Sequence, residues 1–122
     1  HWGDEHDPAT DRQKSLARKM IDAGATCVIG GHPHVVQETE HYKGKPIIYS
    51  VGNFVFNGFD TPETTTGWAL RMTLDKQGVV EWDTITARMD KRGVPIPDLK
   101  ATSPAGKRGS DKIELKVPQT AK

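Results

Sequence analysis

Residues 27–37 read CVIGGHPHVVQ, a short apolar run followed by two glycines and then by two histidines on either side of one proline. A run of this kind that ends in Gly-Gly is typical of a buried strand leading into a loop at the edge of a sheet. Glycine lets the backbone approach a ligand closely, and neutral imidazole is the commonest metal ligand among side chains. The pattern therefore predicts a strand end that presents His32 and His34 to one metal ion or to two adjacent ions.

The sequence on either side of this run predicts an α/β fold. Residues 8–23 show apolar side chains at helical spacing, with Thr10 and Gln13 at the spacing of a capping box and Gly24 as a C-terminal cap. Residues 26–29 and 47–51 have the composition of buried strands. A helix followed directly by short buried strands is typical of α/β proteins.

The second half of the chain predicts a β-hairpin and then an irregular tail. Residues 68–74 and 79–87 alternate apolar and polar side chains around a turn at 75–78, after a polar loop at 57–66. From residue 91 to residue 122 the chain is rich in Pro, Lys, Ser and Gly, which predicts an irregular or partly disordered segment that wraps the domain. One short strand is possible at 112–117. We therefore expect an α/β body over 1–90 and a tail over 91–122.

Composition places limits on the class of protein. With 122 residues the chain forms one domain or part of one, and 17 basic against 16 acidic residues give a net charge of +1, which argues against nucleic acid as a partner. The single Cys27 cannot form an internal disulfide, carries no information on redox compartment and is expected to be a buried small hydrophobe. No signal-peptide pattern and no apolar run near the ~20 residues of a membrane span is evident.

Three further residues are candidates for the site of His32 and His34. His1 is a possible third metal ligand, because catalytic zinc sites often use three protein ligands and keep one position open. Glu5 is either a ligand, a carboxylate that supports one, or a surface charge near a helix start. Asn53 follows Gly52 at a strand end and either aims its amide into the site or serves only the turn. His6 and His41 are expected at the surface. The alternative for His32 and His34 is a turn with exposed histidines, or one imidazole bonded to the backbone, but the flanking glycines and the strand end favour the metal site.

Three motifs carry a resemblance to a known family: HWG at 1–3, GGHPHVVQ at 30–37 and YSVGNFVF at 49–56. Together they resemble the CapA family of bacterial capsule and poly-γ-glutamate biosynthesis proteins over residues 1–56, with a weaker likeness to about residue 90. That family is similar to the calcineurin-like metallophosphoesterases. The resemblance implies that this chain is the C-terminal portion of a four-layer α-β-β-α sandwich with two divalent metal ions (Mn, Fe or Zn) at strand ends.

The resemblance also implies roles and partners. His1 and His32 would bind one metal ion and His34 the other, and the remaining ligands would come from the missing N-terminal half of the domain or a second copy. An anionic polymer or a phosphoester would be the substrate, and other polymer-synthesis proteins would be the partners. The parent protein would lie in the cell envelope, tethered to the membrane and facing outward.

Two functions of different class follow from these observations. In the first, the intact protein is a metal-dependent hydrolase and this chain alone is inactive. In the second, it is a non-catalytic component of polymer assembly or export that binds anionic poly-γ-glutamate.

Overall fold

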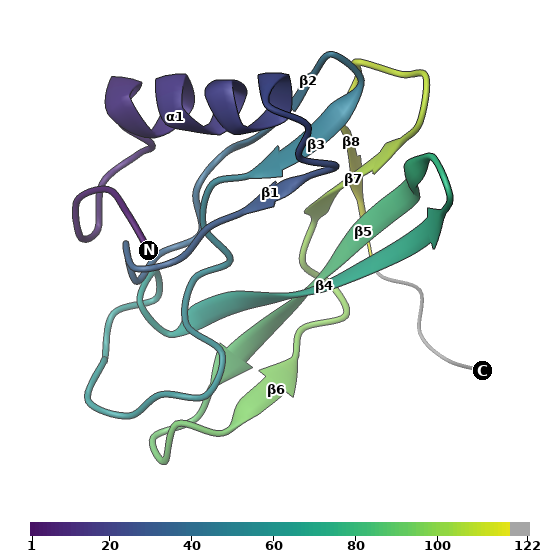
Figure 1. Cartoon of the computed structure of the whole chain (residues 1–122). Helices are drawn as coiled ribbons and strands as arrows, with labels where there is room; N and C mark the ends of the chain where they lie inside the picture. The colour runs from purple at the N-terminus through teal and green to yellow at the C-terminus, as the bar shows by residue number, and fades with distance from the viewer. Residues whose placement is uncertain (118–122) are drawn as a thin grey trace.

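The computed structural model describes residues 1–117 and contains one helix and two β-sheets in this part of the chain (Figure 1). The helix α1 (Asp11–Asp22) begins at the predicted capping box. The Thr10 hydroxyl accepts a hydrogen bond from the Gln13 N–H at 3.2 Å, and Gln13 Oε1 accepts one from the Thr10 N–H at 2.9 Å. Gly24 follows the helix with a φ of 113°, a conformation that glycine adopts without strain.

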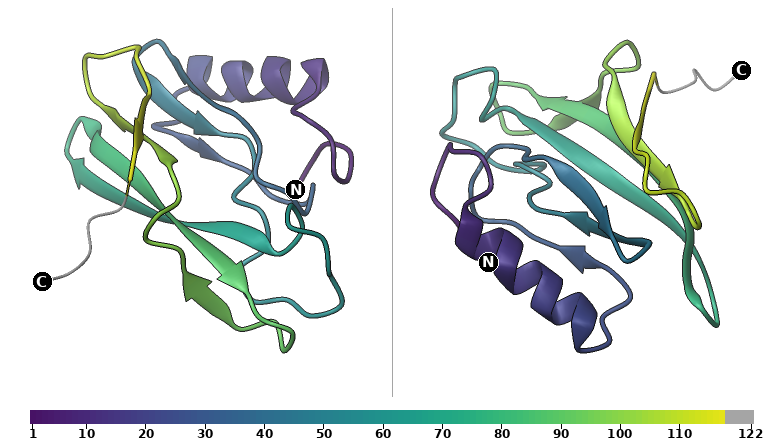
Figure 2. Two further views of the ribbon diagram at one scale, coloured as in Figure 1. Left: turned by 180° about the vertical axis from the view of Figure 1, so that it is seen from behind. Right: turned by 90° about the horizontal axis from the view of Figure 1, so that it is seen from above.

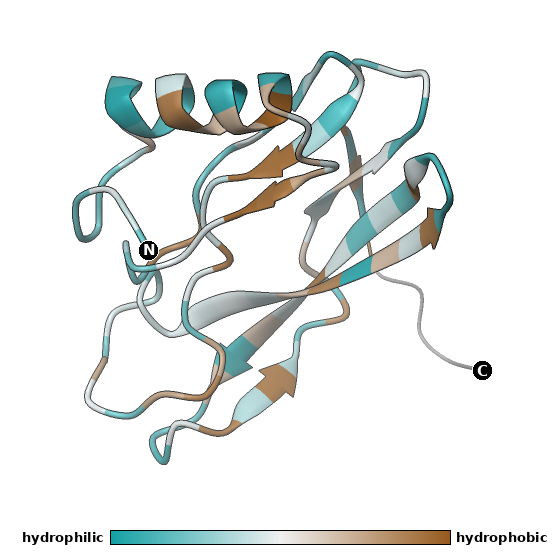
Figure 3. Cartoon of the chain, viewed as in Figure 1, coloured by the Kyte–Doolittle hydropathy of each residue, from teal (hydrophilic) through white to brown (hydrophobic). Residues whose placement is uncertain are grey.

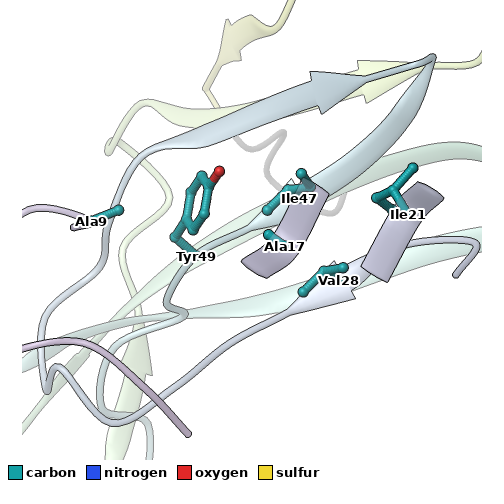
Figure 4. Packing of buried hydrophobic residues seen from close by; sticks show 6 residues of the cluster. All are labelled: Ala9, Ala17, Ile21, Val28, Ile47 and Tyr49. Carbon is teal, nitrogen blue, oxygen red and sulfur yellow. The ribbon is translucent and has the colours of Figure 1, made fainter. Parts of the chain in front are cut away.

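The first sheet lies under α1. Its strand order is β1 (Val28–Ile29), β3 (Lys45–Ile48) and β2 (Thr39–Tyr42), with β1 parallel and β2 antiparallel to β3. The helix covers one face of this sheet (Figure 2). The core between them contains Ala17 and Ile21 from the helix and Val28, Ile47 and Tyr49 from the sheet side (Figure 4). Figure 3 shows apolar residues concentrated on β1 and β3. Both predicted strands are therefore present, although each is shorter than expected or shifted along the chain.

The second sheet is built on the predicted hairpin. β4 (Thr66–Asp75) and β5 (Gly78–Met89) pair antiparallel, and the order continues through β7 (Ser103–Lys107) to β8 (Glu114–Lys116), while β6 (Pro95–Pro97) pairs with the other end of β5. The prediction of an irregular tail is wrong for residues 95–97 and 103–107, which form β6 and β7 because the long β5 offers a free edge for pairing. The possible strand at 112–117 is present as β8, and residues 118–122 lie outside the described part of the chain.

The two sheets meet through a second core cluster of Ile48, Val79 and Trp82, with half-buried Cys27 at its border. The expectation that His41 lies at the surface is wrong. His41 is half-buried, its Nε2 accepts a hydrogen bond from Trp82 Nε1 at 2.9 Å, and its Nδ1 bonds to the Ser110 carbonyl. The class is therefore mixed α/β. Within residues 1–117, no helix has the length and apolar character that crossing a membrane requires.

Candidate metal centre

The N-terminal segment docks on the two glycines that follow β1. The Trp2 backbone N–H donates to the Gly31 carbonyl at 3.2 Å, and the Trp2 indole N–H donates to the Tyr49 carbonyl at 2.7 Å. A Cβ on Gly30 would lie 2.2 Å from the Trp2 indole nitrogen and 2.3 Å from the Tyr49 carbonyl oxygen, so only glycine permits this contact. Docking of Trp2 is what brings His1 and Glu5 beside the His32–His34 loop.

A second set of hydrogen bonds holds the segment between Glu5 and α1. Gln37 Nε2 donates to the Asp7 carbonyl at 2.7 Å, and buried Gln13 Nε2 donates to Gln37 Oε1 at 2.8 Å. The Glu38 carboxylate accepts a hydrogen bond from the Ala9 N–H and pairs with Lys14. Burial alone would raise the pKa of Glu38, but these partners outweigh it and lower the pKa below its ordinary value. The loop that carries Glu5 is thereby tied to residues 37 and 38, between the histidine loop and β2.

The histidine loop itself has a strained backbone. His32 has a φ of 104° and His34 a φ of 61°, on either side of the buried Pro33, whose carbonyl accepts from the His6 N–H at 2.7 Å. Positive φ values are uncommon for residues with a Cβ, and such residues occur preferentially at functional sites. The backbone of both histidines is therefore held in a conformation that an unconstrained loop would avoid.

Three side chains converge in a way that suits a metal ion. Glu5, His32 and His34 each offer a ligand atom, and these atoms all lie within 4.8 Å of one another. The two histidines are half-buried and Glu5 is exposed. One carboxylate and two imidazoles form a donor set that fits zinc, iron or manganese. The His1 ring lies against that of His32, with the centroids 4.0 Å apart.

Asn53 lies behind His34 rather than in the open part of the site. Asn53 is 6% exposed, and its Oδ1 lies 2.9 Å from His34 Nδ1. Gly52 and Gly67 form an isolated antiparallel β-bridge beside Asn53. A Cβ on Gly67 would lie 1.9 Å from the Asn53 carbonyl oxygen. Absence of a side chain at residue 67 therefore allows β4 to pass close to Asn53.

Sequence reasoning missed an aromatic cover over His34. The Phe59 ring centroid lies 5.0 Å and the Phe56 centroid 5.5 Å from that of His34, and the two phenylalanines are 5.0 Å apart. Phe56 belongs to the YSVGNFVF motif, whereas Phe59 lies in the loop at 57–66, whose composition is polar. Phe59 is 25 residues from His34 in the sequence, so its contact with His34 becomes evident only in the folded structure.

The fold and the site thus define an α/β chain with a histidine–carboxylate cluster at the end of a short parallel strand pair. Residues 1–58 match the family described as bacterial capsule synthesis protein PGA_cap. The chain is 55% identical over 58 residues to the PGA biosynthesis protein CapA of Bacillus subtilis, an alignment covering 47% of this chain and 15% of that protein. It is 35% identical over 132 residues to the capsule biosynthesis protein CapA of Bacillus anthracis, covering 96% of this chain and 32% of that protein.

The chain belongs to the CapA family of bacterial capsule synthesis proteins. It spans at most about a third of the length of these two relatives. The part that matches the family profile contains every residue of the candidate metal centre.

Proposed function

We propose that this chain is the metal-binding part of a protein of capsule or poly-γ-glutamate biosynthesis, and that the intact protein is a metal-dependent hydrolase. The observation that carries the proposal is the convergence of ligand atoms from Glu5, His32 and His34 within 4.8 Å. The two relatives named for capsule and PGA biosynthesis supply the biological setting. The superfamily fold and the cell-envelope location implied by the sequence belong to the same proposal.

In the proposed centre, Glu5, His32 and His34 hold a divalent ion, and His1 extends the set toward a second ion beside His32. A bound ion of this kind supplies Lewis acidity toward a phosphoryl or carbonyl oxygen. The protein itself contributes the strained loop that carries the two imidazoles and the Phe56 and Phe59 rings that pack against His34. Three protein ligands leave positions open for a substrate group.

Metal binding to variants of this chain tests the proposal. His34→Ala should lower the Zn²⁺ or Mn²⁺ content measured by plasma mass spectrometry to near the background and weaken binding in calorimetry at least tenfold. His6→Ala is the matched control, because His6 is an exposed histidine on the same segment as Glu5 but outside the three-residue cluster. Equal metal content in wild type and His34→Ala would overturn the metal assignment.

Hydrolase activity is tested separately, in a longer protein that includes sequence N-terminal to His1. Metal-dependent turnover of a model phosphodiester or of a γ-glutamyl peptide, lost in His34→Ala, is the expected result. Metal binding without turnover of either substrate would instead favour the second function, non-catalytic binding of an anionic polymer.

A further inference from the structure

The side chain of Asn53 contacts His34 at two points and a neighbouring turn at a third. Its Nδ2 donates to the His34 carbonyl at 3.2 Å and to the Thr64 carbonyl at 2.8 Å, while its Oδ1 lies 2.9 Å from His34 Nδ1. Asn53 is buried, so water has little opportunity to replace these bonds. One carboxamide thus binds both the main chain and the ring of a residue with a φ of 61°.

These contacts determine where the hydrogen of the neutral His34 ring resides. A backbone carbonyl oxygen can only accept, so the Asn53 atom that faces two carbonyls must be the NH₂ group. The atom that faces His34 Nδ1 is then the carboxamide oxygen, which also only accepts. His34 Nδ1 must therefore carry the hydrogen, and Nε2 keeps its lone pair.

We infer that Asn53 is a positioning residue that fixes His34 as the Nδ1–H tautomer and thereby selects Nε2 as its metal-binding atom. The inference rests on the proposed function only for the metal; the tautomer itself follows from the hydrogen bonds. Hydrogen bonding of the distal ring nitrogen is the usual way in which a protein orients a histidine ligand. Here the partner is a carboxamide, which sets the tautomer without adding a charge to the site.

The surroundings of His34 prevent the ring from escaping this restraint. The Phe59 ring is tilted by 38° against the imidazole at a centroid distance of 5.0 Å, and the Phe56 ring meets it edge-on at 5.5 Å. A half-turn of the imidazole would place a carbon against Asn53 Oδ1 and leave a buried carboxamide oxygen without a donor, which is unfavourable. Asn53 is in turn held by the turn of residues 61–66, where the Thr61 and Thr64 hydroxyls bond to each other at 2.6 Å.

The tautomer can be read directly by long-range ¹H–¹⁵N correlation spectroscopy of the metal-free 122-residue chain at pH 8. We expect His34 to show the pattern of a protonated Nδ1 and an unprotonated Nε2. His41 is an internal reference, because its Nε2 accepts from Trp82 and its Nδ1 faces the Ser110 carbonyl, which requires the same tautomer for independent reasons. A His34 ring that shows the Nε2–H pattern would overturn the inference without any variant being made.

Substitution separates positioning from a general role in folding. Asn53→Ala should give His34 a mixture of tautomers, leave the His41 pattern unchanged and weaken Zn²⁺ binding about 10- to 100-fold. Asn53→Asp keeps an acceptor oxygen for Nδ1 and should retain the Nδ1–H tautomer, but it loses the donor to the His34 and Thr64 carbonyls and should lower stability. Asn57→Ala, an exposed asparagine of the same loop, is the matched control and should behave as wild type. An unchanged His34 tautomer in folded Asn53→Ala would refute the role of Asn53.

The two proposals fail in different ways. If wild-type His34 is the Nδ1–H tautomer and no metal binds, the metal centre is wrong and the assignment of the tautomer to Asn53 stands. If metal binds and His34 shows the Nε2–H pattern, the metal centre stands and the positioning role of Asn53 is wrong.

Discussion

At the scale of single residues, the most informative feature is the backbone of His32 and His34. Both have a positive φ, and each such residue with a Cβ costs on the order of 1–3 kcal/mol. His34 has a compensating partner in Asn53, which bonds to its carbonyl and to its ring. The strain is therefore best explained as the cost of directing two imidazoles toward Glu5.

This explanation predicts that stability and metal binding respond in opposite directions to one substitution. His32→Gly should raise the free energy of unfolding of the metal-free chain by about 1 kcal/mol, because glycine adopts a φ of 104° without steric cost. The same variant should lose affinity for Zn²⁺. Urea denaturation and calorimetry measure the two effects.

His32→Ala provides the control, because it removes the same imidazole and keeps the Cβ that causes the strain. It should lose metal affinity to the same extent without gaining stability. If the free energy of unfolding of His32→Gly is no higher than that of His32→Ala, the loop is not strained at this residue.

Sequence reasoning anticipated some of the residues at the site and could not place others. His32, His34 and Asn53 follow strands, so their position at the sheet edge could be predicted from local pattern. The approach of Glu5 to His32 could not, because it depends on docking of Trp2 on Gly30 and on the Gln37–Asp7 hydrogen bond. The His1 ring lies against the His32 ring, with the centroids 4.0 Å apart, and the assignment of His1 as a ligand stays a prediction.

At the scale of elements, the second sheet shows where pattern recognition fails. The hairpin of β4 and β5 alternates apolar and polar residues and was predicted correctly. β7 reads SPAGK, without the branched or aromatic residues typical of strands, and yet Ser103 and Ala105 are buried. Its small side chains pack closely on β5, and the Thr84 hydroxyl donates to the Pro104 carbonyl at 2.7 Å. Pairing with the free edge of β5 therefore outweighs a weak local preference.

An ion pair connects the end of β4 with the residue that follows β7. Arg108 donates from both terminal nitrogens to the Asp75 carboxylate, with one of these bonds at 2.7 Å. Bonding to Arg108, aided by the Gln77 N–H, lowers the pKa of Asp75 to about 2. A carboxyl group whose pKa is lower in the folded than in the unfolded state stabilises the fold above the unfolded value of about 4, and the contribution is lost as the pH falls toward 2.

We therefore expect Arg108→Gln to raise the pKa of Asp75 toward 4 and to lower stability at pH 6, with the two stability curves converging as the pH approaches 2. Carbonyl NMR titration of Asp75 and urea denaturation at several pH values measure this. Arg71→Gln, which breaks the exposed pair with Asp83 on the same hairpin, should leave the Asp75 pKa unchanged. An Asp75 pKa that stays near 2 in Arg108→Gln would contradict the assigned cause.

At the scale of the whole molecule, the two sheets are joined by a chain of contacts through one buried indole. Trp82 on β5 is 3% exposed, belongs to the core between the sheets and donates its N–H to His41 on β2. His41 in turn bonds to the Ser110 carbonyl in the loop after β7. A Cβ on Gly106 would lie 2.6 Å from both the His41 ring and the Trp82 indole nitrogen, so this strand must also be close-packed there.

This arrangement predicts that the two tryptophans of the hairpin contribute unequally to stability. Trp82→Phe removes ring volume from the core and leaves His41 Nε2 without its donor, which should lower the free energy of unfolding by about 2–3 kcal/mol. Trp68→Phe, at a half-buried position on β4 at the border of the same cluster, should cost about 1 kcal/mol or less. Chemical denaturation of both variants measures the difference. Equal losses would mean that the indole–imidazole contact does not stabilise the junction of the two sheets beyond the packing of the ring itself.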